Sequence, residues 1–451
     1  MLLRMLLLGL FASCWILPVD AAEPLKVGVF DVDASPPVGS PLAYDPTKGV
    51  QIPLSARGIV LLGSDRPIVL CAVDWIGIGG GTHRAFRESL AAAAGTEVAR
   101  VTVHTLHQHD APRSDFRVGD LLEPYGLAEK VSDRAFAEEV IARASQGVRD
   151  AVQKAQVVTH VGVGTATVDK VASNRRILGP DGRVKVTRMT ATKDPAVRAE
   201  PVGTIDPPLR LVTFWQDDKP LVAMSYYATH PQSYYRTGLA NPDFPGMARN
   251  ERQTKTGVPH IHFNGAGGNV GAGKWNDGSP ENRQILADRV ATGMRQAWEQ
   301  TVKSPLTPED VRWNVRSVAL PAALHLEKTA LETLLADEQA PLTDRSRAAH
   351  HLSWLTACQL GETLDVSCLQ LGSVRLLHLP GELFVEYQLA AQALRPEAFV
   401  AMAAYGDYAP GYIGTEVAYS QGGYETSERA SRVAPAVEGV LMGAIEELLS
   451  K

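Results

Sequence analysis

Two histidines stand two positions apart in the stretch LHQHDAP, which follows the apolar run ARVTVHT. They are His107 and His109, and with His104 they place three of the chain's 12 histidines within six positions. Imidazole nitrogens bind zinc and carry protons near neutral pH. Because alternate residues of an extended chain point to opposite sides, we expect one of His107 and His109 to bind a metal and the other to support it or to move a proton.

Further polar side chains directly follow other apolar runs. His230 comes after MSYYAT, Glu382 after RLLHLPG and Tyr412 after MAAYGDYAPG. In open α/β sheets a ligand binds beyond the carboxyl ends of the strands. We therefore expect these strands to bring their residues to one edge and build a metal site there. A lone histidine that bonds a carbonyl, or a glutamate in a first helical turn, is the structural alternative.

A glycine-rich stretch, NGAGGNVGAGKWNDG, spans residues 264–278. Gly268 and Lys274 have the spacing of a phosphate-binding P-loop, but Trp275 stands where that loop needs Ser or Thr to hold magnesium. The shorter run GIGGGT lacks the last glycine of a dinucleotide fingerprint and has Thr82 there. We expect no nucleotide at either place, and a loop at 264–278 whose glycines let backbone approach a substrate.

The common hydrolase signatures are absent. The chain has no Gly-x-Ser-x-Gly elbow and no His-Glu-x-x-His pair, which argues against a serine triad and a zincin protease. Arg175 and Arg176, in ASNRRILG, form a conspicuous basic pair in the middle of the chain. They predict a clamp on a polar or anionic substrate group, or alternatively a solvated hairpin edge.

Short apolar runs alternate with Gly-rich turns and helical patterns along the chain. This alternation predicts an α/β fold with mixed, partly parallel sheets and flanking helices. We expect strands over residues 66–74, 99–105, 219–229, 258–265, 373–379 and 398–407, and a hairpin over 177–186. We expect helices over 82–95, 281–302 and 383–394, and two within 322–357 that separate near Pro341.

The composition is that of an ordinary globular protein. In 451 residues, 44 basic side chains stand against 50 acidic ones, so the chain lacks the basic excess that nucleic-acid binding needs. No linker or repeat divides it, and we expect one domain over residues 23–451. Cys358 and Cys368 flank a short loop, and the sequence leaves open whether they form a disulfide.

Residues 1–22 have the layout of a secretory signal, with Arg4, an apolar run and the small-residue exit DAA. The apolar run is shorter than the roughly 20 residues that a membrane span needs. We expect a signal peptide and a secreted or periplasmic protein without a transmembrane span, for which contact with a membrane surface stays open. A lipid anchor through Cys14 is the weaker alternative.

The order of these motifs resembles the neutral ceramidase family. Similar stretches run from VGVFDVDASPPVG through HQHDAP, SNRR, ATHP, GAGGNVGAG and PGE to APGYIGTEVAYSQGGYE, and they cover most of the chain. The resemblance implies the α/β catalytic domain of that family, a zinc amidase that cleaves the N-acyl bond of ceramide. It implies a zinc ion held by His107, His230, Glu382 and Tyr412.

The same resemblance assigns roles around the metal. His109 matches the second histidine of the family's His-x-His-Ser-Gly-Pro motif, and Arg175 and Tyr424 match residues on the substrate side. Zinc lowers the pKa of a bound water to about 7 and polarises a carbonyl under attack. We then expect His109 to take or return the proton, and Tyr424 or Arg175 to stabilise the oxyanion.

Two departures from the family bear on the substrate. Where the family reads Gly-Asp-Val-Ser-Pro-Asn, the substrate loop here reads GNVGAG, with Asn269 second and Gly271 in place of the serine. We also expect the family's C-terminal β-sandwich domain to be missing. Hydrolysis would then rely on metal-bound water and act on a ceramide-like or other N-acyl amide, or on an ester. The alternatives are a binding protein that keeps the metal without turnover, and a two-metal hydrolase with His104 and Asp110 as further ligands.

Overall fold

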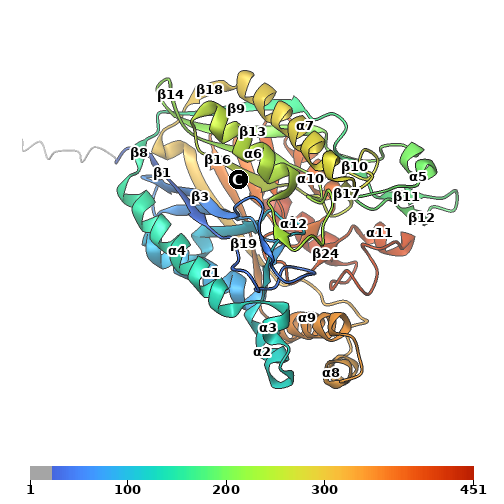
Figure 1. Cartoon of the computed structure of the whole chain (residues 1–451). Coiled ribbons are helices and arrows are strands. Elements are labelled where there is room, and N and C mark those ends of the chain that lie inside the picture. The colour runs from blue at the N-terminus through green and yellow to red at the C-terminus, as the bar shows by residue number, and fades with distance from the viewer. Residues whose placement is uncertain (1–22, 451) are drawn as a thin grey trace, which may run out of the picture.

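The computed structural model of the chain describes residues 23–450 (Figure 1). The expected signal peptide and Cys14 lie outside the described residues. Three sheets of four or five strands carry the architecture, and helices pack on them in separate groups (Figure 1).

The first sheet has the strand order β6-β4-β3-β1-β8. Its strands are β1 (Lys26–Asp33), β3 (Ser55–Leu62), β4 (Ile68–Val73), β6 (Val101–Thr105) and β8 (Gln156–Val157). β4 and β6 pair in parallel, whereas the other pairs are antiparallel. β4 is an unbroken apolar run and is buried along its whole length, as a strand covered on both faces must be. α4 (Arg134–Gln153) packs on β1 and β3, and α1 (Gly80–Ala94) packs on α4 and β6 (Figure 1).

The second sheet has the order β16-β14-β13-β9-β18, and β14 and β16 form its parallel pair. Its strands are β9 (His160–Thr167), β13 (Pro208–Gln216), β14 (Lys219–Tyr227), β16 (His260–Asn264) and β18 (Val302–Pro305). The helices α6 (Asp243–Thr256) and α7 (Pro280–Glu299) pack against each other and against this sheet, at the top of the view in Figure 1.

The third sheet has the order β19-β20-β21-β23, and β21 and β23 form its parallel pair. Its strands are β19 (Val311–Val318), β20 (Leu364–Leu371), β21 (Val374–His378) and β23 (Phe399–Ala403). α10 (Val385–Leu394) packs on β23, and α12 (Val437–Ser450) packs on β19 and β20.

The parallel pairs of the three sheets meet. The Thr105 N–H donates to the Tyr405 carbonyl at 2.9 Å, which joins the end of β6 to the end of β23. The Ala404 N–H donates to the Asn264 carbonyl at 3.0 Å, which joins the end of β23 to the end of β16. The carboxyl ends of the three edge strands therefore lie together, as the sequence pattern predicts.

One hydrophobic cluster draws on all three sheets. It includes Ile59 and Leu70 from the first sheet, Val212 from the second and Leu369 from the third, all fully buried. This shared core joins the three sheets, and the single domain over residues 23–451 stays a prediction.

Short elements connect the sheets. The two-stranded pairs are β2 (Gly49–Val50) with β15 (Leu239–Ala240), β5 (Gly77–Ile78) with β7 (Arg113–Ser114), β10 (Ser173–Asn174) with β17 (Val270–Gly271), β11 (Arg176–Leu178) with β12 (Val184–Thr187), and β22 (Glu382–Leu383) with β24 (Tyr412–Ile413). The remaining helices are α2 (Phe116–Leu122), α3 (Ala128–Val131), α5 (Pro195–Ala199), α8 (Lys328–Ala336), α9 (Leu342–Gln359) and α11 (Glu416–Gln421).

The α/β class with mixed, partly parallel sheets is confirmed. The six expected strands are β4, β6, β14, β16, β21 and β23, and the expected hairpin is β11–β12. The expected helices are α1, α7 and α10, and the pair that separates at Pro341 is α8 and α9.

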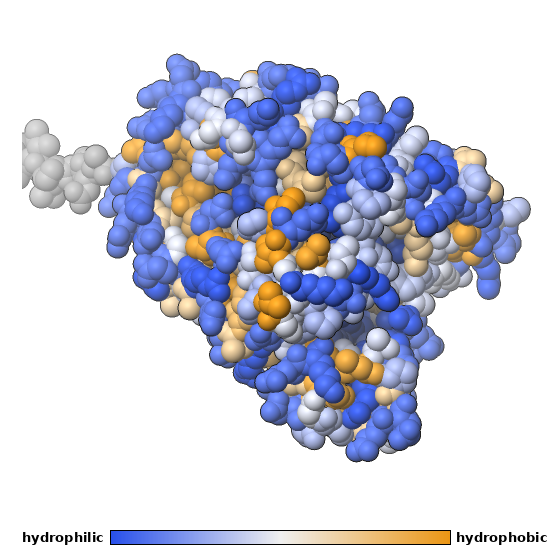
Figure 2. Space-filling model, viewed as in Figure 1, coloured by the Kyte–Doolittle hydropathy of each residue, from blue (hydrophilic) through white to orange (hydrophobic). Residues whose placement is uncertain are grey.

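The structure answers the disulfide question and describes the surface. Cys358, near the end of α9, and Cys368, in β20, are both free thiols rather than partners in a bridge. Within residues 23–450, no helix combines the length and the apolar character that a membrane crossing requires. Figure 2 shows hydrophobic residues in several small groups on a mostly hydrophilic face.

Candidate metal centre

His107 follows β6 and is fixed by two backbone carbonyls. Its N–H donates to the Trp75 carbonyl at 2.9 Å, and its Nδ1 lies 2.5 Å from the Ile76 carbonyl. A carbonyl only accepts, so Nδ1 donates to it and Nε2 is the ring nitrogen left to face the cluster. The Nε2 atom is buried without a hydrogen-bond partner. This is the arrangement in which a histidine is oriented to bind a metal.

The expectation that His107 and His109 point to opposite sides is wrong. It assumed an extended chain, but His107 has a φ of 68°, in the left-handed region. The chain turns there, so the imidazoles of His107, His109 and His230 all face the same space. Ring nitrogens of the three histidines lie within 4.8 Å of one another, and His109 Nε2 is 2.9 Å from His230 Nε2. The three side chains together are therefore able to hold a metal ion.

Glu382 completes this cluster from β22, which follows β21 of the third sheet. Its Oε2 lies 3.2 Å from His107 Nε2 and 3.9 Å from His230 Nδ1. Its Oε1 accepts a hydrogen bond of 2.8 Å from the Tyr408 hydroxyl. The three facing atoms, His107 Nε2, His230 Nδ1 and Glu382 Oε2, are all buried and lack hydrogen-bond partners. Buried polar atoms are normally paired, so this convergence fits a metal ion with nitrogen and oxygen ligands.

The charge states suit a metal ion. Burial lowers the pKa of His230 and of His109 well below its usual range, because a buried imidazolium loses its hydration. Both rings are therefore neutral and offer lone pairs. Burial alone would raise the pKa of the Glu382 carboxyl, but His107, Tyr408 and Tyr412 outweigh it and lower that pKa. Glu382 is thus a carboxylate.

Arg175 borders the cluster with its charge intact. Its Nη1 donates to the Tyr412 hydroxyl at 3.1 Å, and its Nε lies 3.1 Å from Glu425 Oε1. Burial would lower the pKa of this guanidinium, but Tyr412 and Glu425 raise it above its usual value. Its central carbon also lies over the rings of Tyr412 and Tyr424, at 5.8 and 5.7 Å from their centroids. The structure thus brings the predicted residues His107, His109, His230, Glu382, Tyr412, Arg175 and Tyr424 into one connected group.

Three residues of this group were not predicted. Tyr408 donates to Glu382, Glu425 carries the counter-charge of Arg175, and the Tyr44 hydroxyl lies 3.0 Å from His109 Nδ1. Tyr408 immediately precedes the stretch APGYIGTEVAYSQGGYE and Glu425 ends it, so their position gave a usable signal. Tyr44 lies in a loop without any recognisable pattern.

The glycine-rich loop passes behind the cluster. The Asn269 side chain accepts from the Val385 N–H at 2.9 Å and donates to Glu386 at 2.8 Å, so it ties the loop to α10. At Gly271, an added Cβ would lie 2.8 Å from the Thr190 methyl group. At Gly268, it would lie 2.3 Å from the Glu382 carbonyl oxygen. Gly268 thus lets the loop backbone touch the strand that carries Glu382, and Gly271 lies against Thr190.

Lys274 does not face a ligand site. Its Nζ donates to the carbonyls of Arg198 and Glu200. No helix starts beside it either, since α7 begins only at Pro280. The P-loop spacing thus belongs to a loop that fastens the segment around α5.

The two residues proposed for a second metal are engaged elsewhere. His104 Nδ1 bonds the Ala404 carbonyl at 2.7 Å, and its Nε2 lies 3.1 Å from His378 Nδ1. Asp110 accepts hydrogen bonds from the Arg236 N–H and from Thr237. Neither residue belongs to the three-histidine group, so these contacts do not support a two-metal hydrolase.

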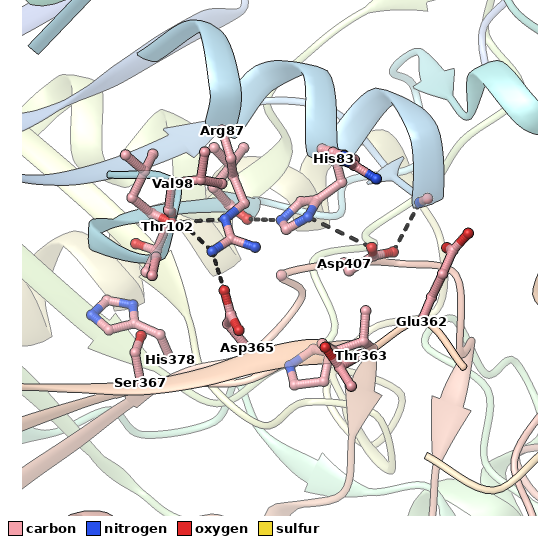
Figure 3. A pocket seen from close by; sticks show the side chains of 18 of the residues that line it. His83, Arg87, Val98, Thr102, Glu362, Thr363, Asp365, Ser367, His378 and Asp407 are labelled. Carbon is pink, nitrogen blue, oxygen red and sulfur yellow. Dashed lines mark hydrogen bonds and ion pairs between the residues drawn. The ribbon is translucent and has the colours of Figure 1, made fainter. Parts of the chain in front are cut away.

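A separate polar cavity of about 540 Å³ lies between α1 and β20 (Figure 3). Arg87 pairs with Asp365 at 2.5 Å, and His83 lies 3.6 Å from Asp407, but burial lowers the pKa of His83 to about 3, so that ring is neutral. His104 lines the cavity, whereas none of the four proposed zinc ligands does. Its wall includes Pro380, in the segment that leads to Glu382. The cavity therefore lies close to the candidate centre but is not lined by the proposed ligands.

Comparisons with known proteins address the fold. A scan against protein-family models finds no match, and a sequence search of curated proteins finds none either. Among solved structures, neutral ceramidase from Pseudomonas aeruginosa matches with a TM-score of 0.68 over 94% of this chain and 74% of that chain, at 16% identity. The chain has the neutral ceramidase fold. A second structure, a ceramidase complexed with C2, matches the same shares with a TM-score of 0.67 and 15% identity.

The neutral ceramidase fold was the one implied by the motif order. At 15–16% identity, the likeness establishes the architecture, and the chemistry has to be argued from the side chains of this chain.

Proposed function

We propose that the chain is an exported, zinc-dependent hydrolase that cleaves an N-acyl amide. The observation that carries the proposal is the convergence of three buried atoms without partners, His107 Nε2, His230 Nδ1 and Glu382 Oε2, at the meeting point of three parallel strand pairs. Support comes from the neutral ceramidase fold, since the solved chains that share it are ceramidases. Export rests on the sequence pattern of residues 1–22 and stays a prediction.

The proposed ligands are His107, His230, Glu382 and Tyr412. Two neutral imidazoles, a carboxylate and a phenolic oxygen are a donor set that suits zinc. When bound, zinc supplies a Lewis acid that polarises the amide carbonyl and acidifies water. His109 is the alternative third imidazole, because it belongs to the same three-histidine group.

His109 is the proposed proton carrier. It is neutral, its Nδ1 is held by the Tyr44 hydroxyl, and its Nε2 faces the cluster. In the proposed reaction, water adds its oxygen to the carbonyl carbon and gives a proton to His109. The C–N bond then breaks, and His109 returns that proton to the leaving amine nitrogen.

Arg175 and Tyr424 are proposed to stabilise the oxyanion. Arg175 stays charged in a buried place because Glu425 neutralises it. A fixed cation is effective there, since no solvent has to reorganise as the charge develops. Tyr424 lies on the same guanidinium and presents a second hydroxyl.

A second candidate is a binding protein that holds the metal without turnover. The observation in its favour is Gly271, which offers no side-chain hydroxyl where the family has a serine. The Thr190 methyl group fills the adjacent space, and its hydroxyl donates to Gln232. Direct attack by water needs no such hydroxyl, so we favour the hydrolase.

Metal analysis of the purified protein tests the proposal. We expect about one zinc ion per chain, and its loss in a His107→Ala/His230→Ala variant. The matched control is His160→Ala/His325→Ala, which removes two histidines outside the cluster. Wild-type protein without zinc, or unchanged zinc in the first variant, would contradict the proposal.

Substrate hydrolysis separates the two candidates. We expect zinc-dependent release of amine from N-acyl amides, with loss of at least about a hundredfold in kcat for His109→Ala, the usual contribution of a general base. Bound zinc without cleavage of any N-acyl amide or ester would favour the binding protein.

A further inference from the structure

Two tyrosines form a wall on the solvent side of His109. The rings of Tyr44 and His109 are stacked, with centroids 5.7 Å apart and planes 16° apart. Tyr235 touches Tyr44 at 4.9 Å between centroids. His109 is 8% exposed, whereas Tyr44 and Tyr235 are 40% and 38% exposed. The tyrosine pair therefore leads from the buried cluster to solvent.

Arg236 lies on this tyrosine wall. Its guanidinium carbon is 5.1 Å from the ring centroid of Tyr44 and 5.7 Å from that of Tyr235. Within residues 23–450, its guanidinium has contacts with these two ring faces and with no carboxylate. The exposed guanidinium of Arg236, which no carboxylate of the described residues pairs with, thus lies on the ring of Tyr44, and that ring in turn stacks on His109.

The position of Arg236 is built by the fold. Its φ is 67°, a left-handed conformation that is costly for a residue with a side chain. Buried Asp110 holds this conformation, because its Oδ1 accepts from the Arg236 N–H at 2.9 Å. Asp110 also lies 3.5 Å from Arg283, a buried residue of α7. The same aspartate that follows His109 therefore anchors the backbone beneath Arg236.

The charges around His109 favour an anion. Arg175 is buried and paired with Glu425 at 3.1 Å. The other nearby carboxylates are buried and engaged as well, Glu382 with His107 and Tyr408, and Asp110 with Arg283, Thr237 and the Arg236 N–H. Among the described residues, Arg236 is thus the exposed charge at the tyrosine wall, and it attracts negative groups. A metal ion at the cluster would add further positive charge.

We propose that Arg236 recognises an anionic group on the amine half of the substrate, so that the preferred substrates are N-acyl amides whose amine carries a carboxylate or another anion. This inference rests on the proposed function. It distinguishes the chain from an enzyme for ceramide, whose amine half is uncharged. Tyr44 and Tyr235 hold the guanidinium over their rings, and no hydrogen bond to a described residue uses its N–H groups, so they are available to an anion.

Three matched compounds test the proposal: N-lauroylglycine and N-lauroyl-4-aminobutyrate, which place a carboxylate at two distances from the amide, and uncharged N-lauroylethanolamine. The readout is the ratio of kcat/KM for each acid to that for the ethanolamide. We expect Arg236→Gln to lower the higher of the two ratios about fivefold, the upper range for an exposed ion pair, and Arg236→Glu to lower it further. We expect 0.5 M salt to lower the ratio in wild-type protein and to change it little in Arg236→Gln.

The matched control is Arg149→Gln. Arg149 is an exposed arginine of α4 whose side chain bonds only Gln146 among the described residues. The Arg149→Gln variant should keep the wild-type ratio of kcat/KM values. Equal ratios in wild type and Arg236→Gln for both acids would overturn the proposal.

Binding measurements separate this proposal from the proposed function. Calorimetry gives Kd values for the same three compounds on the same proteins without turnover. Binding of the acids that depends on Arg236, without hydrolysis of any compound, would overturn the hydrolase and support the anion site. Hydrolysis with Kd ratios that do not depend on Arg236 would support the hydrolase and overturn the anion site.

Discussion

Glu425 is the residue on which the arginine pair of the site depends. Its carboxylate is fully buried and lies 3.1 Å from Arg175 and 3.5 Å from Arg176. Two buried guanidinium groups without a counter-charge would be costly, because neither is hydrated. The resemblance to ceramidases assigned Arg175 a role, whereas the group that keeps it charged emerged only from the packing.

Replacement of Glu425 by glutamine keeps the shape and removes the charge. We expect the free energy of unfolding to fall by about 3 kcal/mol, the usual cost of breaking a buried ion pair. Urea unfolding measures it. Exposed Glu428 is the control, and Glu428→Gln should change the value by less than about 0.5 kcal/mol. A similar small change for Glu425→Gln would show that the arginines find other partners.

Gly271 is explained by its neighbour. A serine there would bring its Cβ to 2.8 Å from the Thr190 methyl group, closer than side-chain carbons normally come. We expect Gly271→Ser to lower the free energy of unfolding by about 1–3 kcal/mol, as overpacking does.

The double variant Gly271→Ser/Thr190→Ser tests that explanation. It removes the clashing methyl group and keeps a hydroxyl for the bond to Gln232. We expect a favourable coupling of at least about 0.5 kcal/mol in the double-mutant cycle. Strictly additive effects would mean that the crowding at Gly271 comes from elsewhere.

At the scale of elements, the sequence predicted most of the strands that position the site. β4 and most of β14 are buried apolar runs that can be recognised in a sequence, and β16 places Ile261 and Phe263 alternately with two histidines. It did not predict α6, since Pro245 and Gly246 stand in its first turns and its residues are largely polar. Nor did it predict that each large sheet ends on a parallel pair, because pairing depends on which strands meet in space. The turn at His107 was missed for the same reason: its left-handed φ is imposed by the bonds to Trp75 and Ile76, which are distant in sequence.

β16 gives the fold a pH dependence. Burial lowers the pKa of His260 and of His262 to about 3, so both are neutral in the folded protein. In the unfolded chain they bind protons near pH 6.5. Unfolding therefore takes up protons below that pH, and the free energy of unfolding falls as the pH is lowered from 7 towards 3.

We expect each of these histidines to contribute a loss of about 2 kcal/mol between pH 7 and pH 5. Urea unfolding at the two pH values measures this loss in the free energy of unfolding. A His260→Gln/His262→Gln variant should lose correspondingly less stability over that interval, whatever its stability at pH 7. An unchanged pH dependence would mean that other groups determine it.

At the scale of the whole molecule, the fold is kept while the sequence is not. This chain and a solved neutral ceramidase share 16% of their residues and superpose with a TM-score of 0.68. Several motifs of the resemblance, HQHDAP, ATHP and GAGGNVGAG among them, follow the carboxyl ends of the parallel pairs. The proposed anion site was not predictable in this way, because Tyr44, Tyr235 and Arg236 lie in loops, and only the folded chain brings them together.

The candidate centre draws its ligands from distant parts of the chain. His107 follows β6 of the first sheet and His230 follows β14 of the second, whereas Glu382 and Tyr412 lie in the short pair β22–β24, which comes after strands of the third. A chain that grows from its N-terminus exposes the histidines long before the carboxylate exists. Only a chain that extends to Tyr412 contains all four proposed ligands, so the proposed zinc site is completed late in synthesis. A chain that ends between Glu382 and Tyr412 would keep the two histidines and the carboxylate but lack the phenolic ligand.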